Sequence, residues 1–171
     1  MRILLLITVL VFSCNKVQSL YPDTDTIIEG QLDWQKKFYF NRIAEFKTNP
    51  IGKNKIVFLG NSIIKGGGDW NQRYGLNNIV NRGISGDYTK GILKRLDEIL
   101  FYKPVSVVLM IGINEFFADN SERPGINPKY VADNIFKIAD IINDYSPKTK
   151  IFIHTILPVS YTHLRAHETG Y

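Results

Sequence analysis

The sequence predicts an α/β fold of three layers, in which a doubly wound parallel sheet lies between helices. Short apolar runs of strand length alternate along the chain with longer amphipathic segments. Their order is β, β, α, β, α, β, and near-continuous apolar strands in such an order are typical of a parallel sheet covered on both faces. With 171 residues, 44% of them hydrophobic, the chain can bury one core, so we expect a single domain.

The amino-terminal half of the predicted domain starts with an amphipathic helix over residues 31–46. Residues 55–59 follow as a buried strand, because this run is short, β-branched and closed by glycine. Residues 78–82 show a weaker strand pattern. Residues 87–102 have apolar side chains on one helical face, and Asp87 is the predicted cap of this helix.

The carboxyl-terminal half has the clearer patterns. Residues 105–112 form the strongest strand pattern of the chain, because they are almost entirely apolar. Residues 128–145 are predicted to form a long amphipathic helix with a proline at its first position. Residues 150–158 are predicted to form another buried strand.

The first 19 residues have the pattern of an export signal, with Arg2 ahead of an apolar run that is too short to span a bilayer. Two processing sites remain open. Residues 17–19 fit a small-residue cleavage site, and residues 11–14 resemble a lipoprotein box in which Cys14 becomes acylated. We therefore expect residues 1–19 to direct export, to a secreted, periplasmic or lipid-anchored location at the cell envelope.

The boundaries of the domain follow from changes in patterning. Residues 20–30 are polar without periodicity, so we expect a linker that leads into a domain over residues 31–159. From Ser160 the apolar patterning stops, and residues 160–171 resemble translated vector or adaptor sequence. We therefore expect a non-native tail and a missing carboxyl-terminal part of the domain. The alternative is a complete short protein.

The charge distribution argues against a nucleic-acid partner. The formal net charge is +5, but the lysines and arginines are scattered along the chain in ones and twos. A nucleic-acid-binding protein would gather them on one stripe with interleaved aromatic residues. Cys14 is the only cysteine, so no disulfide can form within the chain.

Small and polar residues follow three consecutive predicted strands. Ser62 comes after the first strand, Gly83 and Gly86 bracket the turn after the second, and Asn114 comes after the third. Ligands of such sheets bind at the carboxyl ends of the strands, so we expect these residues to meet at one edge. Singly, Ser62 could be a helix cap, the glycines turn residues and Asn114 a loop cap. Their joint occurrence favours an active site.

These three segments resemble the motif blocks of the SGNH hydrolases, the GDSL-type esterases and lipases. The segments are FLGNSI, NRGISGD and IGINE, and the match covers roughly residues 55–158. Two positions depart conservatively from the family pattern: Asn61 and Glu115 stand where aspartate is usual. The resemblance implies the SGNH hydrolase fold, a parallel flavodoxin-like sheet in three layers.

The resemblance also implies the chemistry, which is acyl-ester hydrolysis without metal or cofactor. Ser62 would be the nucleophile, and a histidine would accept its proton. The backbone N–H groups of Ser62 and Gly86 and the side chain of Asn114 would stabilise the oxyanion. Suitable substrates would be O-acetyl groups on carbohydrates or lipid-like esters.

The general base is the part of the family pattern that this sequence does not match. The family supplies it from an Asp-x-x-His segment near the carboxyl terminus, and none of the three histidines fits. His154 lies inside the strand predicted at 150–158, where a histidine of the core or sheet face is expected. His163 and His167 lack the aspartate. In a complete short protein, one of these two would fold back to Ser62.

A function of another class remains open, a non-catalytic module that binds sugar or phosphate. The three consecutive glycines at Gly66–Gly68 favour it, because their N–H groups could surround an anion. No Gly-Lys-Ser/Thr follows them, so a P-loop nucleotide site is not expected.

Overall fold

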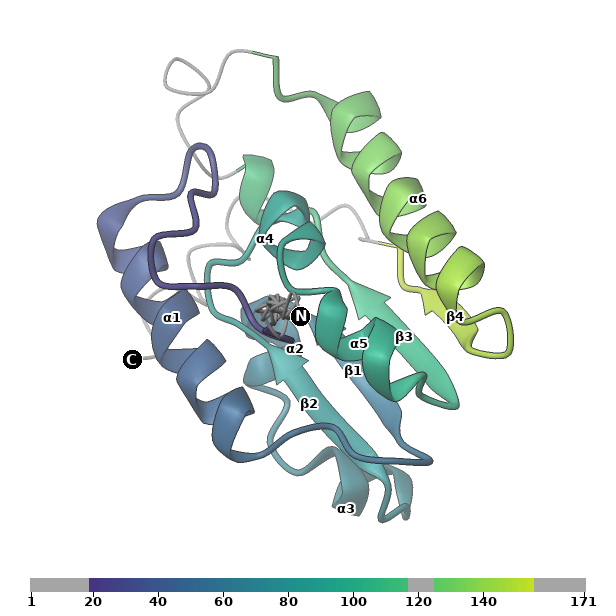
Figure 1. Cartoon of the computed structure of the whole chain (residues 1–171). Coiled ribbons are helices and arrows are strands. Elements are labelled where there is room, and N and C mark those ends of the chain that lie inside the picture. Colours follow the sequence, from purple (N-terminus) through teal and green to yellow (C-terminus); the bar gives the residue numbers. More distant parts are fainter. Residues whose placement is uncertain (1–18, 117–124, 156–171) are drawn as a thin grey trace, which may run out of the picture.

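The computed structural model describes residues 19–116 and 125–155 and shows a four-stranded parallel sheet between two layers of helices (Figure 1). The order of the strands in the sheet is β2-β1-β3-β4. The fold class predicted from the sequence is confirmed. Each strand forms where the apolar pattern predicts it: β1 Ile56–Gly60, β2 Ile79–Gly83, β3 Ser106–Met110 and β4 Lys150–Ile153.

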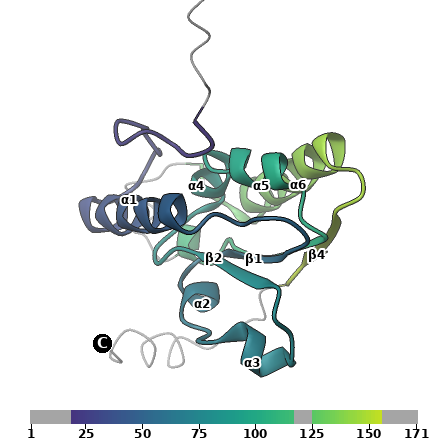
Figure 2. The same ribbon diagram turned by 60° about the horizontal axis from the view of Figure 1, so that its bottom comes forward.

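Helices cover both faces of the sheet unequally. The larger layer holds four helices, and the opposite face carries two short ones between β1 and β2 in the chain (Figure 2). The larger layer consists of α1 Asp33–Thr48, α4 Thr89–Leu93, α5 Asp97–Tyr102 and α6 Pro128–Tyr145. The opposite layer consists of α2 Ser62–Lys65 and α3 Trp70–Tyr74, which the sequence patterns did not predict.

The core lies between the sheet and the larger helical layer. Its central side chains come from β1 and β3 and from α4, α5 and α6, and they are almost fully buried: Val57, Leu59, Ile92, Ile99, Val107, Leu109, Ile138 and Ile142. Burial of one such side chain stabilises a fold by about 1.5–3 kcal/mol relative to exposure. A smaller cluster on the opposite face packs Phe58 against Trp70, with ring centroids 4.9 Å apart.

The prediction of one continuous helix over residues 87–102 is wrong, because the structure has two shorter helices there. α4 ends at Leu93 and α5 begins at Asp97. Between them the Arg95 side chain turns inward, with 5% of its surface exposed, and binds the Asp87 carboxylate. The prediction that Asp87 caps the helix is also wrong: Tyr88 occupies the cap position of α4.

The segment predicted as a linker lacks helices and strands, and it packs against the domain. Ile28 is buried, and the Tyr21 hydroxyl donates to Glu98 Oε1 at 2.9 Å. The predicted export signal with Cys14, and the tail with His163 and His167, lie outside the described residues. Among the helices in the described part of the chain, none is long and apolar enough to cross a membrane.

Candidate active site

Ser62 lies directly beyond the carboxyl end of β1, at the first position of α2. It is not the cap of that helix. The cap is Asn61, whose side-chain oxygen accepts a hydrogen bond from the Ile63 N–H at 3.0 Å. Ser62 is half-buried, and its hydroxyl has no hydrogen-bond partner within residues 19–116 and 125–155. The serine side chain is therefore held at a strand end without a local capping role.

Two glycines allow the Ser62 turn to pack closely against its neighbours. A Cβ atom on Gly60 would lie 2.1 Å from the Met110 carbonyl oxygen of β3. A Cβ atom on Gly83 would lie 2.2 Å from the backbone nitrogen of Lys65 in α2. Any larger residue would push the α2 backbone away from the end of β2, so both glycines are needed for the position of Ser62.

Gly86 lies in a tight turn after β2. The Asp87 N–H donates to the Ile84 carbonyl at 3.2 Å across this turn, and Gly86 has a φ of 75° at its third position. A positive φ there defines a type II turn, for which glycine is the preferred residue. The Ile84 N–H donates to the Gly60 carbonyl at 3.0 Å, so the turn is attached to the strand end that precedes Ser62.

Asn114 begins the short 3₁₀ helix η1 Asn114–Phe116, which follows β3. Its side-chain amide donates to the Asp87 carbonyl at 2.9 Å. The structure therefore brings Asn114 against the residue that follows Gly86. One N–H of the carboxamide makes this bond, and the second N–H has no partner in the part of the chain that the structure describes.

A buried ion pair lies directly behind the loops of the candidate site. Arg95 Nη2 lies 2.8 Å from Asp87 Oδ2, and the two side chains are 4% and 1% exposed. Burial raises the pKa of Asp87 to about 6, although the Arg95 guanidinium acts in the opposite direction and Glu115 adds to the increase. The residue that follows Gly86 thus has a carboxyl group with a raised pKa.

Two backbone donors near the carboxyl ends of β1 and β2 are unpaired within the described residues. The N–H groups of Ser62 and Gly86 form no hydrogen bond with any described residue. The Ser62 N–H is one of the four donors that the start of a helix leaves without an intrahelical partner, and the Gly86 N–H lies within a turn. Donor groups of this kind can bind a small oxyanion.

The glycine run that favoured a phosphate-binding module has another use. The Gly66 N–H donates to the Ser62 carbonyl at 2.7 Å, and the Gly67 N–H donates to the Ile64 carbonyl at 3.3 Å. A Cβ atom on Gly67 would lie 1.8 Å from the Trp70 ring. Gly66 and Gly67 end α2 and leave room for the indole, and the N–H groups of these two glycines are already bound.

The prediction for His154 is wrong in its placement. β4 ends at Ile153, and His154 lies beyond it with an exposed side chain, although its N–H still donates to the Leu109 carbonyl at 2.9 Å. Through the register of β3, this position aligns with Gly60 two strands away. At about 4.8 Å per strand, the two backbones lie roughly 10 Å apart. The described residues therefore place no histidine against Ser62.

Sequence reasoning missed the residues that support the site. Arg95 matched the polar face of a continuous helix, and no sequence signature marks a guanidinium that turns inward. Glu115 was seen only as a conservative departure, yet its Oε1 accepts from the Thr89 N–H at 2.7 Å and so binds η1 to α4. Trp34 matched a core position of α1, but it is 49% exposed and its ring covers Gly86.

The fold and the three strand-end residues define a class, an α/β protein with a candidate site at the carboxyl ends of a parallel sheet. No family model matches the sequence. Platelet-activating factor acetylhydrolase IB subunit alpha1 from Pongo abelii is 26% identical over 136 residues, which cover 77% of this chain and 54% of that protein. The chain thus spans about half the length of the curated relatives that it matches.

Two solved structures share the fold. A protein from Streptococcus pneumonia, provisionally assigned as a platelet activating factor, has a TM-score of 0.56 and 25% identity over 74% of this chain and 56% of that one. A provisionally assigned acylhydrolase from Bacteroides fragilis has a TM-score of 0.56 and 19% identity, and the match covers 75% of this chain and 61% of that one. Together with the curated relatives, these matches confirm the resemblance to the SGNH hydrolases.

Proposed function

We propose that this protein is a serine hydrolase that cleaves acyl esters through an acyl-enzyme on Ser62. One observation carries the proposal. Ser62, Gly86 and Asn114 come from three neighbouring strand ends, and hydrogen bonds through Gly60 and Asp87 hold these strand ends together. The relatives named as acetylhydrolases support the same chemistry.

The reaction follows from the donors and the nucleophile. Ser62 Oγ attacks the ester carbonyl carbon while a base takes its proton. The oxyanion that forms accepts hydrogen bonds from the N–H groups of Ser62 and Gly86 and from the Asn114 amide. The alcohol leaves with the proton, and an acyl-serine remains. Water then attacks the acyl carbon with the help of the same base, which releases the carboxylic acid and restores Ser62.

The base comes from a segment beyond β4 in this proposal. A serine hydroxyl is a weak nucleophile without an adjacent base. His154 lies two strands away, and the chain spans about half the length of its curated relatives. The 171-residue chain should therefore hydrolyse esters slowly. We propose that a longer form of the protein, called the extended protein below, continues the domain beyond residue 159 and contains the missing histidine.

Exposed apolar side chains beside the site favour a substrate ester that has an apolar or a sugar portion. Trp34 and Phe38 of α1 are 49% and 45% exposed, and Ile63, next to Ser62, is 52% exposed. Aromatic rings at a site can contact lipid chains or the faces of sugar rings. We therefore propose O-acetylated carbohydrates or lipid-like esters as substrates. Activity on acetyl esters and on longer acyl esters would distinguish the two.

Export is proposed as well, on the evidence of the first 19 residues alone. If the lipoprotein box is used, cells fed radiolabelled palmitate should incorporate label into the protein, and Cys14→Ser should remove it. Label-free protein with a start at residue 20 would instead identify the cleavage site at 17–19.

The experiment compares two serine variants of the extended protein. Ser62→Ala should abolish hydrolysis of p-nitrophenyl acetate, because the acyl acceptor is lost, and its circular dichroism spectrum should not change. Ser106→Ala is the matched control, since Ser106 is buried at the start of β3, the opposite end of the sheet. Activity retained by Ser62→Ala would refute the proposal. A protein that binds sugars but hydrolyses no ester would instead favour the non-catalytic module.

A further inference from the structure

We infer that Arg95 is a positioning residue that holds the Ser62 turn, the Gly86 turn and Asn114 together as one site. The inference rests on the proposed function, but its test includes a structural measurement that needs no hydrolysis. Arg95 lies between α4 and α5, at the break in the predicted helix, and only its guanidinium reaches the site loops.

The guanidinium of Arg95 binds acceptors from three segments. Its Nε and Nη2 donate to Asp87 Oδ2 at 3.0 and 2.8 Å, behind the Gly86 turn. Nη1 donates to the Arg82 carbonyl at 2.9 Å, and Nη2 also donates to the Gly60 carbonyl at 3.2 Å. Arg95 therefore joins the carboxyl ends of β1 and β2 to the turn that carries Gly86.

Asp87 extends this connection to the third strand end. Its carbonyl accepts the bond from Asn114, while its carboxylate receives Arg95 and the Tyr88 N–H. A change in the Arg95 contact therefore displaces the turn that positions both the Gly86 N–H and the Asn114 amide. The carboxylate packs closely against Gly91, where an added Cβ atom would lie 1.9 Å from Asp87 Oδ1.

Only arginine can make this set of bonds. A planar guanidinium has donors that point in fixed directions, so it can reach a carboxylate and two carbonyl oxygens at once. Lysine keeps the charge but has a single ammonium group on a flexible chain. Arg95→Lys therefore removes the geometry and leaves the charge, which makes it a test of positioning.

The molecule contains a matched control in a second buried ion pair. Arg82 Nε and Nη2 each donate to Glu98 at 2.9 Å, and Arg82 is 2% exposed. Its remaining bond to another segment goes to the Asn49 carbonyl at 2.7 Å, after α1 and away from the carboxyl ends of the strands. Arg82→Lys thus damages a comparable buried pair and leaves the contacts of the site in place.

The first measurement is amide hydrogen exchange by NMR on this chain and its two lysine variants. The Asp87 N–H reports on the Gly86 turn, and the Val107 N–H in the central strand reports on global stability. We expect Arg95→Lys to speed exchange at Asp87 by at least about tenfold more than at Val107. Arg82→Lys should speed both equally. Equal acceleration in Arg95→Lys, or a selective effect of Arg82→Lys, would overturn the inference.

The second measurement is the kinetics of ester hydrolysis by the extended protein. Arg95→Lys should lower kcat about 10²-fold with little change in KM, because small misplacements of reacting groups have effects of this size. Arg82→Lys should keep kcat within about threefold. If Arg95→Lys does not fold, Asp87→Asn replaces it, since it removes the negative charge and one acceptor oxygen from the same contact with little change in shape. If Ser62→Ala keeps full activity, the proposed function fails while the exchange result still stands. If Ser62 is essential and Arg95→Lys is unchanged, this inference alone fails.

Discussion

The two edges of the sheet differ in how their free backbone groups are satisfied. In β2 the alternate residues Ile79, Asn81 and Gly83 face away from β1, because the residues between them bond to that strand. Side chains bind most of these free groups. Asn71 bonds to both the N–H and the carbonyl of Ile79, at 2.8 and 3.1 Å. Arg42 of α1 donates to the carbonyl of Gly83 at 3.2 Å and to that of Asn81 at 3.5 Å.

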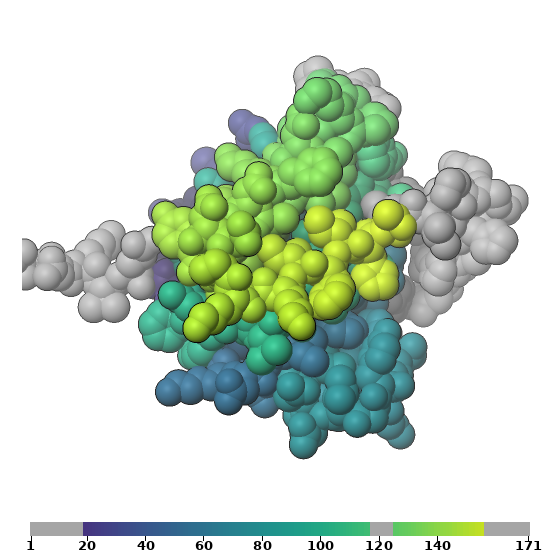
Figure 3. Space-filling view, turned by 90° about the vertical axis from the view of Figure 1, so that its right-hand side faces the viewer, coloured from purple at the N-terminus to yellow at the C-terminus, as the bar shows by residue number. Residues whose placement is uncertain are grey.

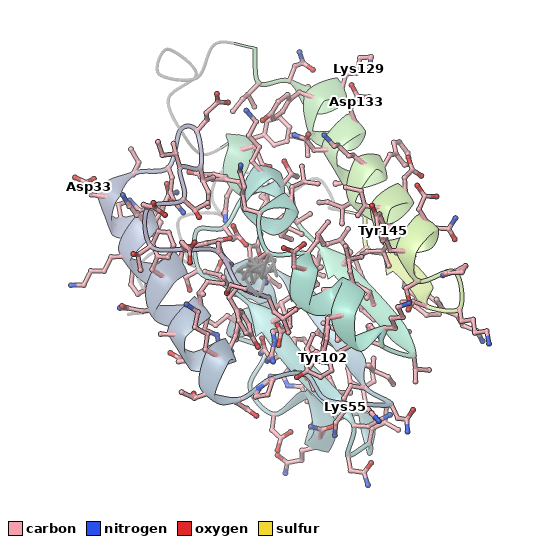
Figure 4. The ribbon with its side chains drawn as sticks, viewed as in Figure 1. Asp33, Lys55, Tyr102, Lys129, Asp133 and Tyr145 are labelled. Carbon is pink, nitrogen blue, oxygen red and sulfur yellow. The ribbon has the colours of Figure 1, made fainter. Side chains whose placement is uncertain are left out.

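The opposite edge has no such protection within the described residues. Ile151 and Ile153 of β4 face away from β3, and no described residue bonds to their backbone groups. Apolar side chains are exposed around this edge, with Phe152 54% and Ile153 42% exposed. Figure 3 faces this side and shows β4, in yellow, uncovered beside α6. The outer surface of α6 carries the exposed Lys129–Asp133 pair, and it also exposes Phe136 at 61% (Figure 4).

The difference between the two edges indicates from which side the general base of the proposed site would come. The proposed nucleophile and the proposed oxyanion donors lie at the ends of β1, β2 and β3. Within residues 19–116 and 125–155, no histidine around the open edge lies against Ser62. An open apolar edge invites pairing with another strand. We therefore expect the extended protein to cover β4 and to supply the base from the same side.

The largest effect should come from extending the chain past β4. The extended protein should hydrolyse p-nitrophenyl acetate about 10²–10⁴ times faster than the 171-residue chain, since general-base catalysis contributes this much. It should also be more soluble. Both proteins are assayed side by side at pH 8. Comparable turnover by the short chain, lost on mutation of His163 or His167, would show that the tail supplies the base and that the comparison of edges is misread.

Asn114→Ala tests whether the protected side holds a working oxyanion site. The loss of one donor should lower kcat of the extended protein on the order of 10²–10³-fold and leave KM nearly unchanged, because the bond forms only in the transition state. Steady-state kinetics measure both constants. A higher KM with an unchanged kcat would assign Asn114 to substrate binding.

The buried charge on the protected side gives a pH test. The folded pKa of Asp87, about 6, lies above the unfolded value near 3.9, so the folded state holds this proton more tightly. The contribution of Asp87 to stability therefore falls as the pH rises from about 4 to about 6. Asn cannot titrate, so Asp87→Asn should gain stability relative to the wild type over this interval, by up to roughly 3 kcal/mol.

Urea unfolding of both proteins at pH 4 and pH 7 measures this difference. The charged and titratable groups around Asp87 are Arg95, Glu115 and Tyr39, and all are present in both proteins. A relative loss of stability by Asp87→Asn at pH 7 would mean that Arg95 outweighs burial and that the pKa of Asp87 is lowered.

The smallest effects concern the edges themselves. Phe152→Lys should reduce aggregation of the 171-residue chain, because a charge on an open edge discourages pairing, and it should hardly change stability. Arg42→Ala should lower the free energy of unfolding by about 1 kcal/mol, since it leaves the Gly83 carbonyl unbound and the Asn81 carbonyl with only its bond from Arg82. Light scattering and urea unfolding check the two expectations. If Arg42→Ala raised solubility and Phe152→Lys did not, the description of β2 as the protected edge and β4 as the open edge would be wrong.

The sequence predicts the fold well because apolar periodicity alone specifies its strands. α6 begins and ends at the predicted residues, and the four strands differ from prediction mainly at their ends. The helices α2 and α3 were missed because four or five residues give too little periodicity. The break between α4 and α5 was missed because it depends on a tertiary contact of Arg95, which no local pattern encodes.

The candidate site could be predicted in part for the same reason. Glycines and polar residues directly after strands identified Ser62, Gly86 and Asn114, since chain order alone places strand ends together. The supporting contacts depend on distant segments. Trp34 and Arg95 reach the Gly86 turn from α1 and from the turn before α5, and neither is near it in sequence.

Covalent labelling of Ser62 tests the central claim most directly. The extended protein is treated with a fluorophosphonate, and the modified peptide is identified by mass spectrometry. We predict one adduct, on the peptide that contains Ser62, which disappears in Ser62→Ala and persists in Ser106→Ala. An adduct on Ser85 or another serine, or no adduct on a folded protein, would contradict the account.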